Sequence, residues 1–180
     1  MSALWRRLDV PGHDAARIAS LDGGWILRGA AAFLHETGPA GVAYMVETDE
    51  CWTTKRGKLR GFLGEKPVHF DIVREPECWR LNGLAVPGLS HLLDLDLSFT
   101  PATNLLQLKR AALRVGGSAS LPAAWLNLDD ESLTELPQRY RRLTQSTYAY
   151  AAPTVPYQSV LELGEDGFVT SYPGLWRRVG

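Results

Sequence analysis

Along residues 93–100, apolar and polar side chains alternate one by one. The apolar members are Leu93, Leu95, Leu97 and Phe99, and the polar members are Asp94, Asp96, Ser98 and Thr100. Successive side chains of a β-strand point to opposite faces, so this pattern predicts a strand with an apolar ridge on one face and oxygen atoms on the other. Pro101 has no N–H group to donate and should end the strand. After a short turn, residues 105–110 should resume an extended conformation.

Glycine-containing pairs mark the turns in the rest of the chain. Asp22-Gly23, Asn82-Gly83 and Asp166-Gly167 each lie between runs rich in β-branched and aromatic residues. Such pairs adopt the positive φ values of tight turns, so we predict a β-hairpin at each, with a type I′ turn at the first.

Other short runs are further strand candidates, at residues 123–128, 139–143 and 146–150. Residues 129–136 could begin a helix, but Pro137 would stop it almost at once. No stretch of helical length is strongly amphipathic, so the pattern predicts a mainly antiparallel β protein.

The length of 180 residues and the hydrophobic content of 45% allow one well-buried core. We therefore predict a single domain over residues 1–180, in which residues 1–14, broken by Pro11-Gly12, form an N-terminal arm. A meander of many hairpins must curl or close to hide its edge strands. The expected fold is one all-β antiparallel sheet of many strands, rolled into a barrel-like shape.

Charge and cysteine content narrow the class of protein. Nineteen Lys and Arg residues stand against 20 Asp and Glu residues, so no global field attracts a polyanion and nucleic acid is not an expected partner. Two cysteines are too few for a disulfide framework. The start of the chain lacks the apolar core of a signal peptide, and no run has the apolar length of a membrane span. We expect a cytoplasmic protein with reduced thiols.

Familiar catalytic and cofactor motifs are missing. Residues 116–120 lack the closing glycine of a nucleophile elbow, and no glycine-rich phosphate loop occurs. The four histidines are scattered without metal-ligand spacing. Cys51 and Cys78 stand beside tryptophans in strand-like runs, which is typical of inert packing. We therefore predict neither a metal nor a cofactor.

Asp94 and Asp96 are the best candidates for catalysis. Two residues apart on one strand face, they would stand about 7 Å from each other and could form an acid–base pair. We favour two solvated or salt-bridged carboxylates instead, because alternating aspartates also suit the wet face of a strand.

Arginines and aromatic residues share the strand-like segments. If some of them face inward, the interior of a rolled sheet would offer flat apolar surfaces to sugar rings or acyl chains, with hydrogen-bonding groups to orient them. The alternative is that the aromatic residues form the core and the cations line the solvent face.

Four stretches together resemble the bacterial putative glycolipid-binding protein family, over nearly the whole chain. They are Leu-Asp-Leu-Asp-Leu-Ser-Phe-Thr-Pro-Ala-Thr-Asn at residues 93–104, Gln-Arg-Tyr at 138–140, Tyr-Pro-Gly-Leu-Trp-Arg-Arg at 172–178 and Asp-Gly-Gly-Trp at 22–25. The resemblance implies a soluble, all-antiparallel, spirally rolled β-sheet that binds a glycolipid or another lipid. It supplies no catalytic or ligand residues to carry over.

Our first hypothesis is a binding protein, monomeric or homodimeric, that holds an amphipathic ligand, a glycolipid, in the interior or mouth of the roll. Aromatic residues would pack against apolar or sugar faces, and polar residues would meet hydroxyls or an acidic headgroup. The candidate contacts are Trp25, Arg28, Asp94, Asp96, Asn104, Arg139, Tyr140, Tyr150, Tyr172 and Trp176.

Two other functions stay open. A hydrolase or isomerase would use Asp94 or Asp96 in the same cavity, and one of these carboxylates would then have a raised pKa. An interaction module would carry its aromatic residues in an exposed patch or a dimer interface.

Overall fold

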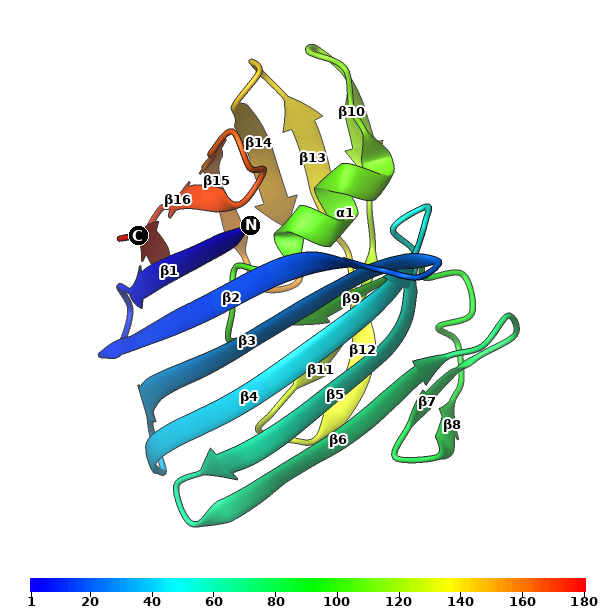
Figure 1. Cartoon of the computed structure of the whole chain (residues 1–180), viewed down its shortest axis with the longest axis vertical. Coiled ribbons are helices and arrows are strands. Elements are labelled where there is room, and N and C mark those ends of the chain that lie inside the picture. Colours follow the sequence, from blue (N-terminus) through cyan, green and yellow to red (C-terminus); the bar gives the residue numbers. More distant parts are fainter.

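The computed structural model describes residues 1–180 and consists of two β-sheets and one short helix (Figure 1). The larger sheet contains fourteen strands. In chain order these are β1 (Ser2–Arg7), β2 (Gly12–Leu21), β3 (Gly24–His35), β4 (Gly38–Asp49), β5 (Thr54–Leu63), β6 (Lys66–Arg74), β7 (Trp79–Leu81), β8 (Leu84–Val86), β10 (Ser118–Ser120), β13 (Arg139–Arg142), β14 (Thr147–Ala152), β15 (Tyr157–Leu163), β16 (Val169–Tyr172) and β17 (Trp176–Arg178).

The larger sheet is rolled and open. Its strands follow one another in the order β10-β13-β14-β15-β16-β17-β1-β2-β3-β4-β5-β6-β7-β8, so β10 and β8 end the sheet without pairing to each other. Every neighbouring pair is antiparallel. Figure 1 shows β2 to β6 as one broad wall and β13 to β16 as a second group of strands above it in the view. The predicted all-β rolled sheet is confirmed.

A smaller sheet and the helix occupy the concave side of this roll. The smaller sheet has the order β12-β11-β9, with β9 (Asp94–Leu97), β11 (Ala123–Asn127) and β12 (Ser132–Leu136). Strands β9 and β11 are parallel, which is the one departure from antiparallel pairing. Helix α1 (Asn104–Ala111) follows β9. Together they place most buried apolar side chains of the chain in one continuous core.

The N-terminal residues and two other segments differ from expectation. Residues 2–7 form β1, which pairs with β17 and β2 in the middle of the sheet, so the expected N-terminal arm is wrong in this part. Trp5 explains the difference, because its side chain is fully buried and its indole N–H donates a hydrogen bond to the carbonyl oxygen of Val169 at 2.6 Å. Burial of so large an apolar group anchors the segment.

Residues 105–110 are helical, so the expected extended conformation is wrong. Leu105, Leu106 and Leu108 are all buried in the space that the rolled sheet encloses. Tertiary packing of these side chains, rather than local pattern, selects the helix. Residues 129–136, where a short helix could have begun, instead contribute strand β12, which pairs with β11.

All three predicted hairpins are present. Asn82 and Gly83 both have positive φ angles, of 50° and 83°, as a type I′ turn between β7 and β8 requires. Gly23 has a φ of 72° but Asp22 does not have a positive φ, so the expected type I′ turn is wrong there. The third hairpin joins β15 and β16 through a longer loop.

Strand β9 has two different faces, as its alternation predicts, but its polar face is also largely covered by protein. The Leu95 side chain packs directly on Gly57 of β5, so closely that a Cβ atom at that glycine would clash with it. On the opposite face, Asp94 forms a bidentate ion pair with Arg110 of α1, at 2.9 and 2.6 Å. Asp96 accepts a hydrogen bond from the side-chain amide of Gln138 at 2.6 Å. The expected solvated face is therefore wrong at Asp94, which α1 covers, and the alternative of a salt-bridged carboxylate is confirmed there.

Candidate functional site

A cavity of about 260 Å³ lies at one end of the roll, between the smaller sheet and the inner faces of β14 to β17. It collects side chains from many elements that are distant in sequence. Five of the ten predicted contacts line it, namely Asp96, Asn104, Tyr150, Tyr172 and Trp176. It is the place where the structure brings the predicted residues together.

Aromatic rings form much of the cavity wall. Tyr172 and Trp176 are directly opposite each other on β16 and β17, so both point inward. The Tyr172 ring lies edge-on to Tyr150 and Tyr157, with centroid distances of 5.7 and 5.3 Å. Trp125 of β11 completes the aromatic lining. These faces are flat and largely apolar, which suits the C–H face of a sugar ring or an acyl chain.

Asp96 is the one ionisable acid or base on this wall besides the tyrosines. Its Oδ2 atom accepts the hydrogen bond from Gln138, while Oδ1 has no hydrogen-bond partner within the protein. The side chain is half-buried, since protein surrounds it except where it borders the cavity. Loss of hydration raises its pKa to about 6, which the hydrogen bond from Gln138 opposes only in part. The carboxylate therefore offers a free acceptor to a hydroxyl group in the cavity.

A buried network of amides and one phenol supports this carboxylate from behind. Tyr140 is almost fully buried, and its hydroxyl accepts a hydrogen bond from Asn104 at 2.9 Å and donates one to Gln107 at 3.1 Å. Gln138 lies 3.5 Å from the same hydroxyl. The network fixes the amide that holds Asp96, so the carboxylate is positioned before any ligand arrives.

A second buried carboxyl group adjoins the cavity through Thr100. Thr100 lines the cavity, and its hydroxyl donates a hydrogen bond of 2.5 Å to Asp14 Oδ2. Tyr44 donates another to the same oxygen at 2.8 Å, whereas Asp14 Oδ1 has no partner. Burial raises the pKa of Asp14 to about 6, against the lowering effect of these hydrogen bonds.

The other predicted contacts lie away from the cavity surface. Asp94 is fully buried in its ion pair with Arg110, and Tyr140 sits behind the wall in the polar network. Trp25 stacks on Trp52 at 4.5 Å and does not line the cavity. Arg28 is exposed on the outer face of the large sheet.

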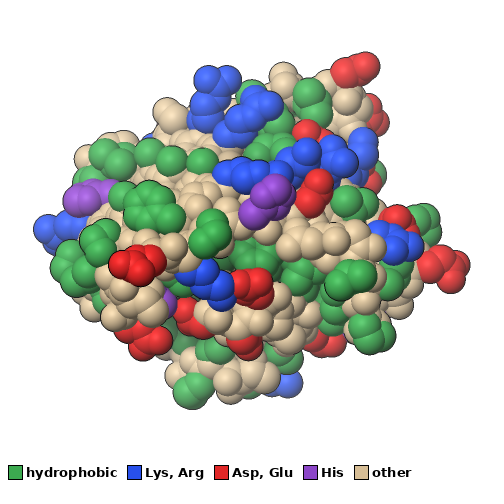
Figure 2. Space-filling view, turned by 90° about the horizontal axis from the view of Figure 1, so that it is seen from below, with side chains coloured by type: hydrophobic (Ala, Val, Ile, Leu, Met, Phe, Trp, Pro, Cys, Tyr) green, Lys and Arg blue, Asp and Glu red, His purple; other side chains and the backbone are tan.

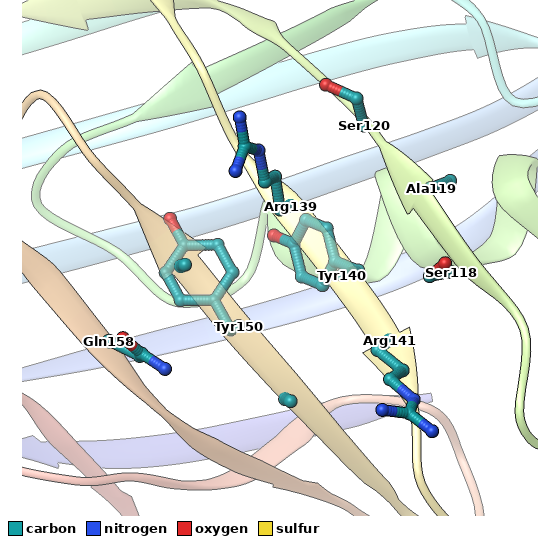
Figure 3. A pocket seen from close by; sticks show the side chains of 10 residues that line it. Ser118, Ala119, Ser120, Arg139, Tyr140, Arg141, Tyr150 and Gln158 are labelled. Carbon is teal, nitrogen blue, oxygen red and sulfur yellow. The ribbon is translucent and has the colours of Figure 1, made fainter.

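Arg139 also lies on the outer face, on the opposite side of β13 from Tyr140. With Arg141 it borders a shallow groove of about 410 Å³, beside Ser118 and Ser120 of β10 (Figure 3). Neighbouring residues of a strand face opposite ways, so the Arg139 side chain points to the outer face while the Tyr140 side chain points inward. The same alternation would have placed Gln138 inside with Tyr140.

Sequence reasoning missed several residues of the site. Trp125 and Tyr157 line the cavity, and Gln138 holds Asp96, but none of them was predicted as a contact. Gln138 lies inside the Gln-Arg-Tyr stretch, so strand alternation could have found it. No sequence pattern marks Asp14 as part of the site, because the partners of its Oδ2 atom come from β4 and from the segment after β9.

The surface of the molecule shows no single dominant charge on the side seen in Figure 2, where acidic, basic and apolar side chains are interspersed. No three His, Cys, Asp or Glu side chains come together in a way that could hold a metal ion. No helix is long and apolar enough to cross a bilayer.

Comparison with known proteins gives one family and one fold. The model of a family described as "Putative glycolipid-binding" matches residues 2–178. The structure is similar to the crystal structure of a DUF1089 family protein from Pseudomonas aeruginosa, with a TM-score of 0.78 and 24% sequence identity over 91% of this chain and 92% of that chain. At this identity the likeness shows the fold. No curated protein matches the chain.

Proposed function

The chain belongs to the family described as "Putative glycolipid-binding", and we propose that it binds the sugar headgroup of an amphipathic ligand, a glycolipid, in the cavity beside Asp96. The observation that carries this proposal is the free Oδ1 atom of Asp96 on a wall of tyrosine and tryptophan rings. A carboxylate that accepts hydrogen bonds from hydroxyls, with rings that cover C–H faces, is chemistry suited to a sugar.

The lining also favours a neutral headgroup over an acidic one. No Lys, Arg or His side chain lines the cavity, and Arg28 and Arg139 lie outside it. A phosphate or sulfate would therefore meet the Asp96 carboxylate without a compensating cation. Hydroxyl groups, by contrast, donate hydrogen bonds to it.

The size of the cavity limits what it encloses. Its volume of about 260 Å³ is just below the 300 to 1,000 Å³ that is typical of sites for drug-sized ligands. It fits a headgroup rather than a whole two-chain lipid. Val155 and Leu175 lie on the turns at its rim, and Val155 is 40% exposed, so acyl chains would leave along this apolar edge.

Tryptophan fluorescence tests the proposal, because Trp125 and Trp176 line the cavity. We expect octyl glucoside, below its micelle concentration, to change the emission and octyl sulfate to leave it unchanged. Asp96→Asn should weaken glucoside binding about tenfold or more, the loss of a hydrogen bond to a charged group.

Two tryptophan variants show which tryptophan reports the change in emission. Trp176→Phe should reduce the emission change, whereas Trp25→Phe, at the remote Trp25–Trp52 stack, should preserve it. If Asp96→Asn left the affinity for octyl glucoside unchanged and Trp176→Phe left the emission change unchanged, the ligand would bind elsewhere and the proposal would be wrong.

Catalysis by Asp96 is a second candidate, since a pKa of about 6 suits a general acid or base near neutral pH. The expected partnership with Asp94 has no support, because Arg110 holds Asp94 behind the wall. Asp96 is thus the single carboxylate at the cavity, whereas glycoside hydrolysis usually needs two. Turnover of nitrophenyl glycosides or esters that disappears in Asp96→Asn would establish it.

The interaction module has no exposed aromatic patch to support it, whereas its dimer interface stays a prediction. Phe62 is the one aromatic residue with an exposed side chain, so the expected exposed aromatic patch is wrong.

A further inference from the structure

Two pairs of arginines face each other across neighbouring strands on the outer side of the large sheet. Arg6 of β1 is directly opposite Arg177 of β17, and Arg17 of β2 is directly opposite Arg28 of β3. All four side chains are exposed, and none forms a salt bridge or a side-chain hydrogen bond. Like charges directly opposite each other on a sheet repel, so each pair costs stability unless an anion lies between its members.

The four strands carry no acid that could neutralise these pairs. Strands β17, β1, β2 and β3 are consecutive in the sheet, and Asp14 is the one acidic residue within them. Its side chain points to the interior, where Thr100 and Tyr44 bind it. The whole chain has a net charge of −1, so the positive charge of this face is local.

A shallow apolar groove lies between the two pairs. It has a volume of about 580 Å³, and Leu4, Ala15 and Ala30 contribute to its floor. Arg17 and Arg28 line one end of it, and the backbone of Gly180 lies at its rim. Arg6 stands two residues beyond Leu4, about 7 Å along the same face of β1. The floor is aliphatic, and Leu4 is 40% exposed.

We propose that this outer face of β17, β1, β2 and β3 docks on the anionic phospholipid headgroups of a bilayer surface. Guanidinium groups bind phosphate in a bidentate manner, and a basic surface gains affinity for each arginine near an anionic leaflet. Leu4 and the alanines match the apolar boundary beneath the headgroups. No phenylalanine, tyrosine or tryptophan side chain lies on this face, whereas proteins that bind single-stranded nucleic acids stack the bases on such rings.

The docking surface goes beyond the proposed function, because it depends on the arginine pairs and needs no ligand in the cavity. It also bears on that function through β17. Trp176 of this strand lines the cavity, while the next residue, Arg177, faces outward. A bilayer in contact with Arg177 would therefore lie one sheet thickness from the cavity wall.

Co-sedimentation of the full chain with vesicles tests the proposal. We expect binding to phosphatidylcholine vesicles that contain phosphatidylglycerol, no binding to phosphatidylcholine alone, and release by salt as the charges are screened. Arg6→Gln with Arg177→Gln, and Arg17→Gln with Arg28→Gln, should each weaken partitioning roughly thirtyfold, about fivefold per arginine. Neither double variant should lower the melting temperature, since each removes a repulsion.

Arg139→Gln with Arg141→Gln is the matched control, because it removes the same charge from β13, elsewhere on the rolled sheet. Its partitioning should change less than about threefold. An equal loss in this control would mean that charge alone, and not this face, drives binding. Failure to bind anionic vesicles, or tighter binding to double-stranded DNA than to them, would overturn the proposal. The vesicles contain no glycolipid, so a failure of cavity binding leaves this result unaffected.

Discussion

The cavity and the outer face of the large sheet carry opposite chemistry, although strand β17 contributes to both. The cavity has tyrosine and tryptophan rings, one carboxylate on β9 of the smaller sheet, and no cation. On β17, β1, β2 and β3 the outer face has four unpaired arginines and no carboxylate. Alternation along each strand separates the two sets, as Trp176 and Arg177 illustrate. Each carboxylate inside the roll is held by at least one hydrogen-bond donor or cation, whereas the four outer arginines have no such partner.

The largest effect should come from removing a cation on the inside. Arg110→Gln leaves Asp94 fully buried without its ion pair, which we expect to cost about 3 to 5 kcal/mol of unfolding free energy. Arg28→Gln, on the outside, should change it by less than about 0.5 kcal/mol. Urea unfolding of both variants measures the difference, and equal costs would contradict the contrast between the faces.

Stability should fall as the pH rises from about 4 to about 6. Asp14 and Asp96 have pKa values raised to about 6 by burial, from an ordinary 3.8. A carboxyl that binds its proton more tightly when folded stabilises the fold in acid. That contribution is complete below the unfolded pKa and is lost as the pH passes the folded one.

For fully buried Asp14 the change approaches about 3 kcal/mol, and it should be smaller for Asp96, which borders the cavity. Urea unfolding at several pH values checks this, with Asp14→Asn expected to flatten the profile. A wild-type profile that is already flat between pH 4 and 6 would show that burial does not perturb these groups.

A smaller effect should come from the polar network behind the cavity. Tyr140→Phe removes the hydroxyl that joins Asn104 and Gln107, leaving buried amides unpaired at a cost of about 1 to 3 kcal/mol. Tyr148→Phe is the control, because Tyr148 is also buried but its hydroxyl has no hydrogen-bond partner. We expect the control to unfold like the wild type, and similar losses in both would point to packing instead.

The smallest effect should arise at the rim of the cavity. The Tyr157 hydroxyl donates a hydrogen bond of 2.5 Å to the carbonyl oxygen of Pro173, which ties the β14–β15 turn to the β16–β17 turn. Tyr157→Phe should cost about 1 kcal/mol or less while it speeds exchange of octyl glucoside, as stopped-flow fluorescence would measure. Unchanged exchange would show that this bond does not restrict the entrance.

Local patterns in the sequence determined the strand content of the protein. Alternation in residues 93–100 correctly predicts a two-faced strand, although the strand spans only Asp94–Leu97. The three Asx-Gly pairs mark three hairpins, because side-chain direction and turn geometry depend on neighbouring residues. The motifs at 93–104 and 172–178 also point to the family that the comparison identifies. Tyr150, Tyr172 and Trp176 line the cavity because they lie on inward-facing positions of such strands.

Tertiary structure alone decided what those faces meet. Helix α1 and the residues around Gln138 largely cover the polar face of β9, so Asp94 gains Arg110 and Asp96 gains Gln138, which no spacing in the chain announces. The same packing makes residues 105–110 helical and turns Ser2–Arg7 into a central strand. These outcomes depend on contacts between residues far apart in sequence, and burial of apolar surface, a property of the whole fold, supplies their free energy.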